Sequence, residues 1–162
     1  MKKILVITFL LICRFSLTIE AQVRVNLNLS TQPIWGPEGY DHVDYYYLPE
    51  IDVFYNVPIQ QYIYLERGRW IFARSLPPRY NGFDLFLGNK VVINEYKPYR
   101  RVTEYRTKYA SERGNSNQKV IRNSQDSRYF ENKEHPQHDQ WHKEYKIPKK
   151  NNINGSSKKR PN

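Results

Sequence analysis

Between residues 44 and 94 the sequence alternates short aromatic and aliphatic runs with turn-forming residues, and this rhythm most constrains its fold. Tyr, Phe, Val and Ile fit the pleated surface of a strand, whereas Pro or Gly between the runs ends it. An Arg-Gly pair joins two of the runs and favours a hairpin. Residues 51–74 are therefore predicted to form a three-stranded antiparallel meander. The runs are residues 44–48 (DYYYL), 51–57 (IDVFYNV), 61–66 (QYIYLE), 69–73 (RWIFA) and 90–94 (KVVIN).

The flanking segments complete the predicted architecture. Residues 23–30 (VRVNLNLS) alternate strictly between apolar and polar, which predicts a half-buried strand. Residues 99–112 predict a short helix with Val102, Tyr105 and Tyr109 along one stripe. The expected fold class is mainly β: a small antiparallel meander sheet of about five to six strands, with a short helix and a disordered basic C-terminal tail.

Both faces of the predicted strands carry apolar side chains, and the chain holds 14 Tyr, 7 Phe and 3 Trp. Such a sheet either folds over on itself or presents an aromatic face to something else. Rings on a sheet can stack on sugars, bases or peptides, although in a small sheet they more often form the core. The candidates for ligand contact are Tyr45, Tyr46, Tyr47, Tyr62, Tyr64 and Trp70.

The N-terminus has the layout of a secretory signal peptide. Lys2 and Lys3 precede an apolar run at residues 4–13, and a short polar stretch ends at Ala21. Ten helical residues rise about 15 Å, roughly half the hydrocarbon thickness of a bilayer, so we expect no transmembrane span after cleavage. Cleavage after Ala21 would also remove Cys13, the only cysteine. We expect a protein exported to the periplasm or secreted from a bacterial cell.

The formal net charge of +10 is unevenly distributed. Residues 22–96 hold 6 Lys and Arg against 8 Asp and Glu, whereas residues 97–162 hold 17 against 7. Basic clusters bind polyanions by releasing counterions. Export favours lipopolysaccharide, anionic lipid headgroups or wall polymers as partners over nucleic acid, and a solubilising tail without a partner is the alternative. The basic candidates are Arg100, Arg101, Lys149, Lys150, Lys158, Lys159 and Arg160.

Three stretches of the chain resemble a family of small exported bacterial proteins. They read WGPEGYDHVDYYYLPEIDVFYN, QYIYLERGRWIFARSLPPRY and GFDLFLGNKVVINE. The family typically carries YYYxPxIDVYY and GRWIxxxSLPPRY segments, which correspond to residues 45–55 and 68–80. The similarity covers about residues 33–110. The resemblance implies export and a β-rich domain, and it implies no catalytic residues.

Three histidines near the C-terminus raise the possibility of metal binding. His138 and His142 would share a helix face at i, i+4, a spacing that can chelate Zn, Cu or Ni. Pro136 interrupts any helix that runs through His135. The alternatives are a transition-metal site of His135, His138 and His142, or a polar tail that merely contains them.

The sequence gives little support to catalysis. Asp41, Asp44, Glu50 and Asp52 cluster with His42, and paired carboxylates could hydrolyse glycosides or bind a cation. Such sites are usually built in deep pockets of larger scaffolds. No P-loop, dinucleotide fingerprint or nucleophile elbow occurs, so no cofactor is expected. A small hydrolase is therefore the least favoured alternative.

The expected organisation has four parts: a signal peptide at 1–21, a β-rich domain at 22–96, a short helical segment at 97–112 and a flexible basic tail at 113–162. The function that fits best is a non-enzymatic envelope protein that binds or scaffolds. Its Tyr-rich sheet would supply the contact surface, and its tail would bind anions.

Overall fold

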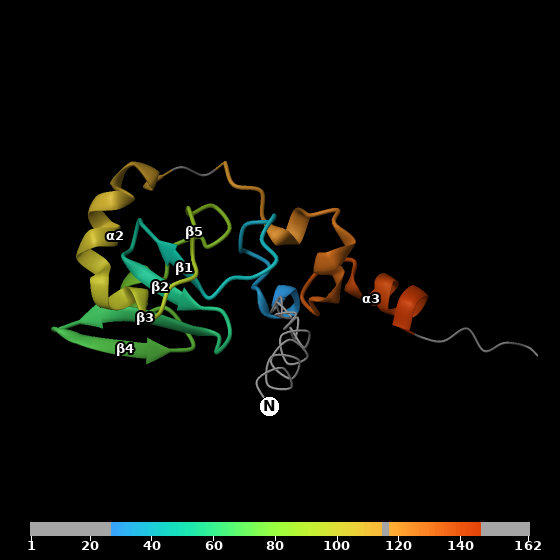
Figure 1. Cartoon of the computed structure of the whole chain (residues 1–162), viewed down its shortest axis with the longest axis horizontal. Helices are drawn as coiled ribbons and strands as arrows, with labels where there is room; N and C mark the ends of the chain where they lie inside the picture. The colour runs from blue at the N-terminus through green and yellow to red at the C-terminus, as the bar shows by residue number, and fades with distance from the viewer. Residues whose placement is uncertain (1–26, 115–116, 147–162) are drawn as a thin grey trace, which may run out of the picture.

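The computed structural model describes residues 27–114 and 117–146, so the predicted signal peptide lies outside it. A five-stranded antiparallel sheet, ordered β4-β3-β2-β1-β5, forms the centre of the molecule (Figure 1). The fold is mainly β, as predicted. The main elements are β1 (Tyr45–Leu48), β2 (Val53–Asn56), β3 (Gln61–Glu66), β4 (Arg69–Ala73), β5 (Val91–Ile93), α2 (Val102–Lys108) and α3 (His138–Trp141). Short 3-10 turns occupy Leu29–Thr31, Pro78–Tyr80, Pro98–Arg101, Ala110–Glu112, Ile121–Asn123 and Ser127–Glu131, and a π-helical turn occupies His142–Lys146.

The connections of the meander use left-handed backbone conformations. Asp52 lies between β1 and β2 with φ 52°, and Gln60 lies between β2 and β3 with φ 53°. Arg67 and Gly68 join β3 to β4 with φ 48° and 75°. Positive φ at both central residues matches the right-handed twist of a two-residue hairpin. Strands β3 and β4 have the bounds that the sequence predicts, and the predicted three-stranded meander is confirmed.

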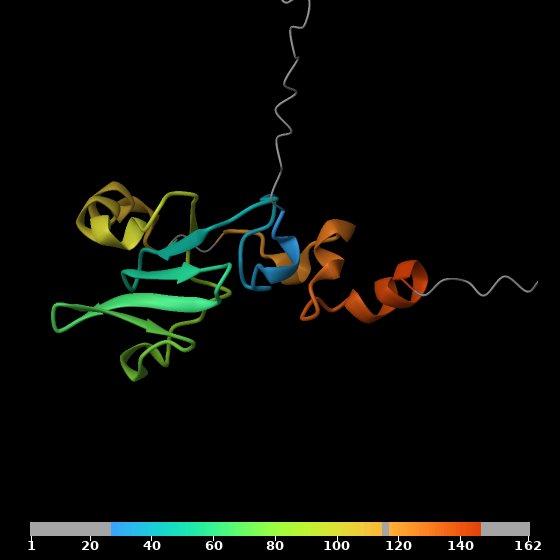
Figure 2. The ribbon, with the colours of Figure 1, turned by 60° about the horizontal axis from the view of Figure 1, so that its bottom comes forward.

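Helix α2 covers one face of the sheet (Figures 1 and 2). Its predicted stripe of Val102, Tyr105 and Tyr109 packs against this face, with Tyr105 almost completely buried. The ring centroid of Tyr105 lies 5.8 Å from that of Tyr47 and 5.5 Å from that of Phe54. The aromatic residues on this side of the sheet therefore form a core.

Irregular chain covers the opposite face, from the loop before β1 and from residues 76–86. Trp35 is the largest side chain that the loop contributes. Its ring centroid lies 5.5 Å from that of Tyr46 and 5.0 Å from that of Tyr55. Because both faces of the sheet are covered, its strands are apolar on both sides.

Residues 117–146, which the sequence places in a flexible tail, instead fold against the loop before β1. The backbone N–H of Ile121 donates to Gly36 O at 2.8 Å, and an isolated β-bridge joins Pro37 to Val120. These contacts bring the C-terminal segment against the loop that carries Gly36 and Pro37. Residues 115–116 and 147–162 of the predicted tail lie outside the described part of the chain.

A small core fixes this junction. Leu29, Ile121 and Tyr129 are buried together, with Ile121 completely inaccessible. The hydroxyl of Tyr129 accepts hydrogen bonds from the backbone N–H groups of Gly39 at 2.7 Å and Tyr40 at 3.1 Å. One tyrosine thus satisfies two loop donors that would otherwise be unpaired.

The predicted strand at residues 23–30 needs correction. Leu29–Thr31 form a 3-10 turn, and residues 23–26 lie outside the described ranges. The cause is the side chain of Asn28, whose Nδ2 donates to Val43 O at 2.6 Å while its Oδ1 accepts from Val43 N at 2.9 Å. An Asn side chain that mimics a backbone partner in this way favours a turn over a strand.

Candidate binding cleft

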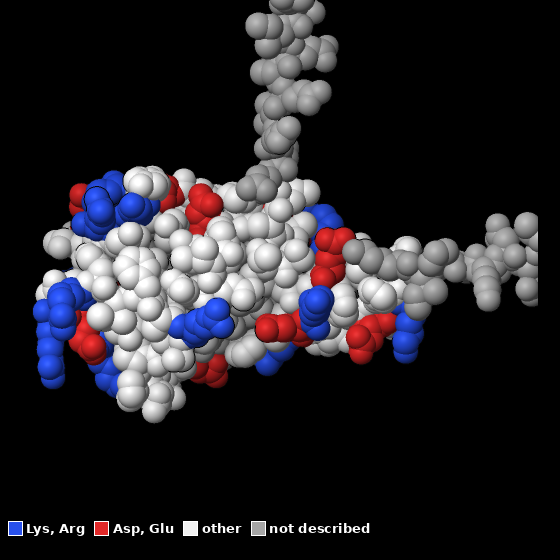
Figure 3. Space-filling view, turned by 90° about the horizontal axis from the view of Figure 1, so that it is seen from below, with Lys and Arg blue, Asp and Glu red and all other residues white. Residues whose placement is uncertain are grey.

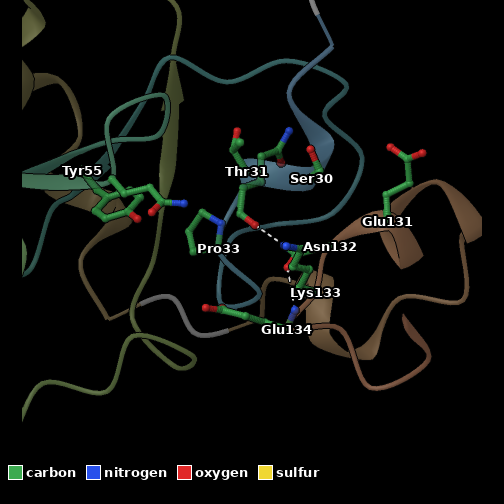
Figure 4. Close-up of a pocket in the computed structure, with 10 residues that line it drawn as sticks. Ser30, Thr31, Pro33, Tyr55, Glu131, Asn132, Lys133 and Glu134 are labelled. Carbon is green, nitrogen blue, oxygen red and sulfur yellow. Dashed lines mark hydrogen bonds between the residues drawn. The ribbon is translucent and has the colours of Figure 1, made fainter. Parts of the chain in front are cut away.

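A polar cleft of about 380 Å³ opens where the loop before β1 meets the C-terminal segment (Figure 4). One wall is the 3-10 turn at Leu29–Thr31 with the two residues that follow it, and the other wall is residues 131–134. The end of the cleft toward the sheet is formed from β2 and the β2–β3 turn. The lining residues are Ser30, Thr31, Gln32, Pro33, Tyr55, Gln60, Glu131, Asn132, Lys133 and Glu134.

Buried amides hold the two walls together. Gln32 is fully buried, and its Nε2 donates to Tyr40 O at 3.0 Å while its Oε1 accepts from the Tyr46 hydroxyl at 3.1 Å. The Nδ2 of Asn132 donates to the backbone oxygen of Gln32, and the Oδ1 of Asn132 accepts from Glu134 N at 3.0 Å. Buried polar groups that are paired so completely fix a local geometry. The cleft is therefore a preformed feature of the fold.

Tyr55 is the group in the cleft that is best placed to form a hydrogen bond with a ligand. Its side chain is only 7% exposed, yet its hydroxyl finds no hydrogen-bond partner among the described residues. Figure 4 shows Tyr55 entering from the sheet side, while Glu134 extends from the opposite wall toward the same space. Burial, with a smaller contribution from the Glu134 carboxylate, raises the pKa of Tyr55 to about 12. Tyr55 therefore keeps its proton at neutral pH and can donate it to a ligand.

The remaining groups make the cleft rich in hydrogen-bonding atoms and slightly acidic. Glu134 has no ion pair or hydrogen bond to its carboxylate within the described ranges. Ser30, Gln60 and the ammonium of Lys133 add further polar groups, whereas the Glu131 carboxylate points away from the centre (Figure 4). The Glu134 carboxylate, which extends into the cleft, disfavours an anion there. The arrangement suits a neutral ligand with many hydroxyl groups.

The structure places the predicted aromatic contact residues in the core. Tyr46 and Tyr47 are fully buried, and Tyr62 and Tyr64 are less than 9% exposed. Only Tyr45 and Trp70 are half-buried. The predicted Tyr-rich contact surface is therefore the interior of the fold on both faces of the sheet.

The three candidate histidines do not converge. His135 is buried, its Nδ1 accepts from Gln137 N at 3.1 Å, and burial lowers its pKa. His138 hydrogen-bonds through Nδ1 to Phe130 O at 2.7 Å, and its ring centroid lies 5.8 Å from that of His142. In the part of the chain that the structure describes, no group of three His, Cys, Asp or Glu side chains is placed to hold a metal.

The acidic candidates have structural partners. Asp52 binds Arg106 at 3.0 Å and accepts a hydrogen bond from the Tyr47 hydroxyl at 2.8 Å. Asp41 pairs with Arg128. The other members of the set are also engaged: His42 with Asp44 at 3.0 Å, and Glu50 with the backbone N–H of Asn89 at 2.9 Å. These carboxylates bind separate parts of the chain and do not share a cleft.

Of the predicted polyanion contacts, two lie in the part of the chain that the structure describes. Arg101 pairs with Glu95 and Glu104, whereas Arg100 is exposed and has no ion pair in the described ranges. The described residues hold 17 Lys and Arg against 15 Asp and Glu and are nearly neutral. Five predicted polyanion contacts lie outside them: Lys149, Lys150, Lys158, Lys159 and Arg160.

No family model, curated protein sequence or solved structure matches this chain. Within residues 27–114 and 117–146, no helix is both long and apolar enough to cross a membrane. The choice of function therefore depends on the chemistry of the cleft. Sequence reasoning missed the cleft wall at 131–134, and a signal for it was the presence of apolar residues such as Ile121 and Tyr129 in a polar segment.

Proposed function

We propose that the protein is an exported, non-enzymatic binding protein of the bacterial envelope, and that its cleft binds a saccharide. The observation that carries the proposal is the Tyr55 hydroxyl, which has no hydrogen-bond partner among residues 27–114 and 117–146 and lies in a cleft whose walls are already fixed. A binding site gains specificity from a few well-placed polar groups in a preformed hollow. The Tyr55 hydroxyl and the Glu134 carboxylate are such groups.

A saccharide fits this set better than an anion or an apolar molecule. Each sugar hydroxyl can donate to the Glu134 carboxylate and accept from the Tyr55 hydroxyl or the Lys133 ammonium. Hydrogen bonds to charged groups contribute more than neutral ones, about 1.5–3 kcal/mol each. Ser30 and Gln60 extend the contacts along the cleft. A phosphate group would face the Glu134 carboxylate instead.

The basic C-terminal residues complement the cleft in this proposal. The described residues carry a net charge of +2, and residues 147–162 add +5. An anionic polymer of the envelope would attract those lysines and arginines, with strong salt dependence. Two weak contacts to one polymer combine into tight attachment because the second contact is intramolecular. The proposal therefore assigns recognition to the cleft and retention to the basic residues.

Neutral oligosaccharides, such as oligomers of N-acetylglucosamine and of hexoses, are the probes for the cleft. Tyr55→Phe removes one hydroxyl and keeps the buried ring, so we expect affinity to fall about tenfold. Tyr62→Phe is the matched control, since Tyr62 is equally buried and does not line the cleft. Titration by NMR should show shifts at Ser30 and Glu134. Equal affinities for the two variants would contradict the proposal.

Export and the absence of catalysis are tested separately. Mass spectrometry of protein from its own cells should find a chain that begins at Gln22 in an envelope or secreted fraction. A chain that keeps Met1 in the cytosol would overturn the envelope assignment. Incubated oligosaccharides should be recovered intact, and cleavage of a glycosidic bond would make the protein a hydrolase.

A further inference from the structure

One edge of the sheet is open. Strand β4 is the last strand on its side, and it pairs only with β3. Outside that pairing, no hydrogen bond between described residues involves the backbone of Arg69–Ala73. The strand contains no proline and no bulge, two of the devices that prevent another strand from pairing with an edge.

The other edge of the sheet, at β5, is partly covered by a side chain. The side chain of Gln118 lies beside the start of β5, where its Oε1 accepts from Lys90 N at 2.8 Å and its Nε2 donates to Lys90 O at 2.8 Å. This amide reproduces the pair of hydrogen bonds that a neighbouring strand would make. Strand β5 is also only three residues long. Strand addition is therefore favoured at β4 and not at β5.

Apolar side chains accompany the open edge on the α2 face. Phe72 of β4 is 47% exposed and Leu65 of β3 is 44% exposed. Trp70 lies opposite Leu65 and is half-buried. The rings of Trp70 and Phe72 pack against the ring of Tyr99, whose centroid lies 5.3 Å from that of Trp70 and 5.5 Å from that of Phe72. This contact holds both rings in place. Alternate residues of an added strand would meet this apolar row.

Positive charge accompanies the edge at both ends. Arg67 and Arg69 lie at the hairpin, and Arg74 follows β4. None of the three has an ion pair among the described residues, whereas five other arginines do. Figure 3 views the molecule from this side and shows Lys and Arg side chains at the hairpin end, beside a broad uncharged area. The edge therefore favours an acidic partner.

We propose that β4 binds an extended acidic peptide segment of another protein by strand addition. The backbone of β4 supplies the hydrogen bonds, and Trp70 and Phe72 receive alternate apolar residues. Arg69 alternates with Trp70 onto the other face of β4 and receives the acidic residues between them, and Arg67 and Arg74 add positive charge at the two ends. A second copy of this chain fits less well, because an antiparallel β4–β4 pair would bring Arg74 of each copy next to Arg67 and Arg69 of the other.

A synthetic peptide with alternating Glu and Val residues, seven residues long, is the probe. On the full mature chain, we expect its addition to slow amide hydrogen exchange of β4 at least tenfold. Binding should weaken at least tenfold between 0.05 and 0.5 M salt. A peptide with Lys in place of each Glu should bind at least tenfold more weakly.

A variant with reversed charges at the β4 edge tests the role of the arginines in peptide binding. Arg69→Glu combined with Arg74→Glu changes two exposed side chains, so the fold should persist, and affinity for the acidic peptide should fall at least tenfold. Lys143→Glu, at an exposed position near α3, is the control and should bind normally. Peptide binding that protects other strands, or protection of β4 by self-association of the protein alone, would overturn the proposal.

Discussion

Replacing Ile121 with Ala tests how firmly residues 117–146 belong to the fold. Ile121 is completely buried against Leu29 and Tyr129. The change removes three carbon atoms, each contributing about 0.8 kcal/mol by transfer from water, and it leaves a cavity that costs more where neighbours cannot relax. We expect the free energy of unfolding to fall by about 3 kcal/mol.

Urea denaturation followed by circular dichroism and tryptophan fluorescence measures this loss. Ile59→Ala is the matched control, because it removes the same atoms from a side chain that is 56% exposed. Its expected loss is within about 0.5 kcal/mol. If Ile121→Ala were no more destabilising than Ile59→Ala, the C-terminal segment would not be packed as the structure shows.

Three further predictions concern packing and pH. Gly36→Ala should lower the free energy of unfolding by about 1–3 kcal/mol in thermal or urea denaturation, because its Cβ would lie 2.7 Å from the Tyr46 hydroxyl, whereas Gly82→Ala has open space and should be neutral. Burial lowers the pKa of Lys90 to about 8, so above that pH the unfolded chain binds more protons than the folded chain. Urea titrations should therefore show the free energy of unfolding rising by about 2 kcal/mol between pH 8 and 10. The Lys90→Met variant should not show this rise. Burial raises the pKa of several tyrosines, that of Tyr55 to about 12, so their contribution to the free energy of unfolding is complete below pH 10 and is lost as the pH rises above it. The absorbance of tyrosinate should therefore appear together with unfolding. Ionisation of all tyrosines near pH 10 would contradict their burial.

The sheet could be predicted because its signals are local. Alternation and the Arg67-Gly68 pair define β3 and β4 within a window of about 13 residues. The stripe of Val102, Tyr105 and Tyr109 likewise defines a helix within two turns. Which tyrosines are buried could not be predicted, since that depends on α2 and on the loop that carries Trp35.

The cleft could not be predicted for a related reason. Asn132 and Gln32, whose hydrogen bond joins its walls, are 100 residues apart in the sequence. A polar segment with few aliphatic residues has the composition of a disordered chain. Here a few buried side chains, such as Ile121 and Tyr129, are enough to dock it against a loop that needs hydrogen-bond partners.

Residue-resolved hydrogen exchange of the mature protein tests most directly whether the C-terminal segment builds a wall of the cleft. The amides of Ile121 and Arg122 donate to Gly36 O and Ile34 O at 2.8 and 2.9 Å. We expect both amides to exchange at least 100-fold more slowly than in an unstructured peptide. Exchange at the unstructured rate would mean that the segment does not dock and that the cleft does not exist in solution.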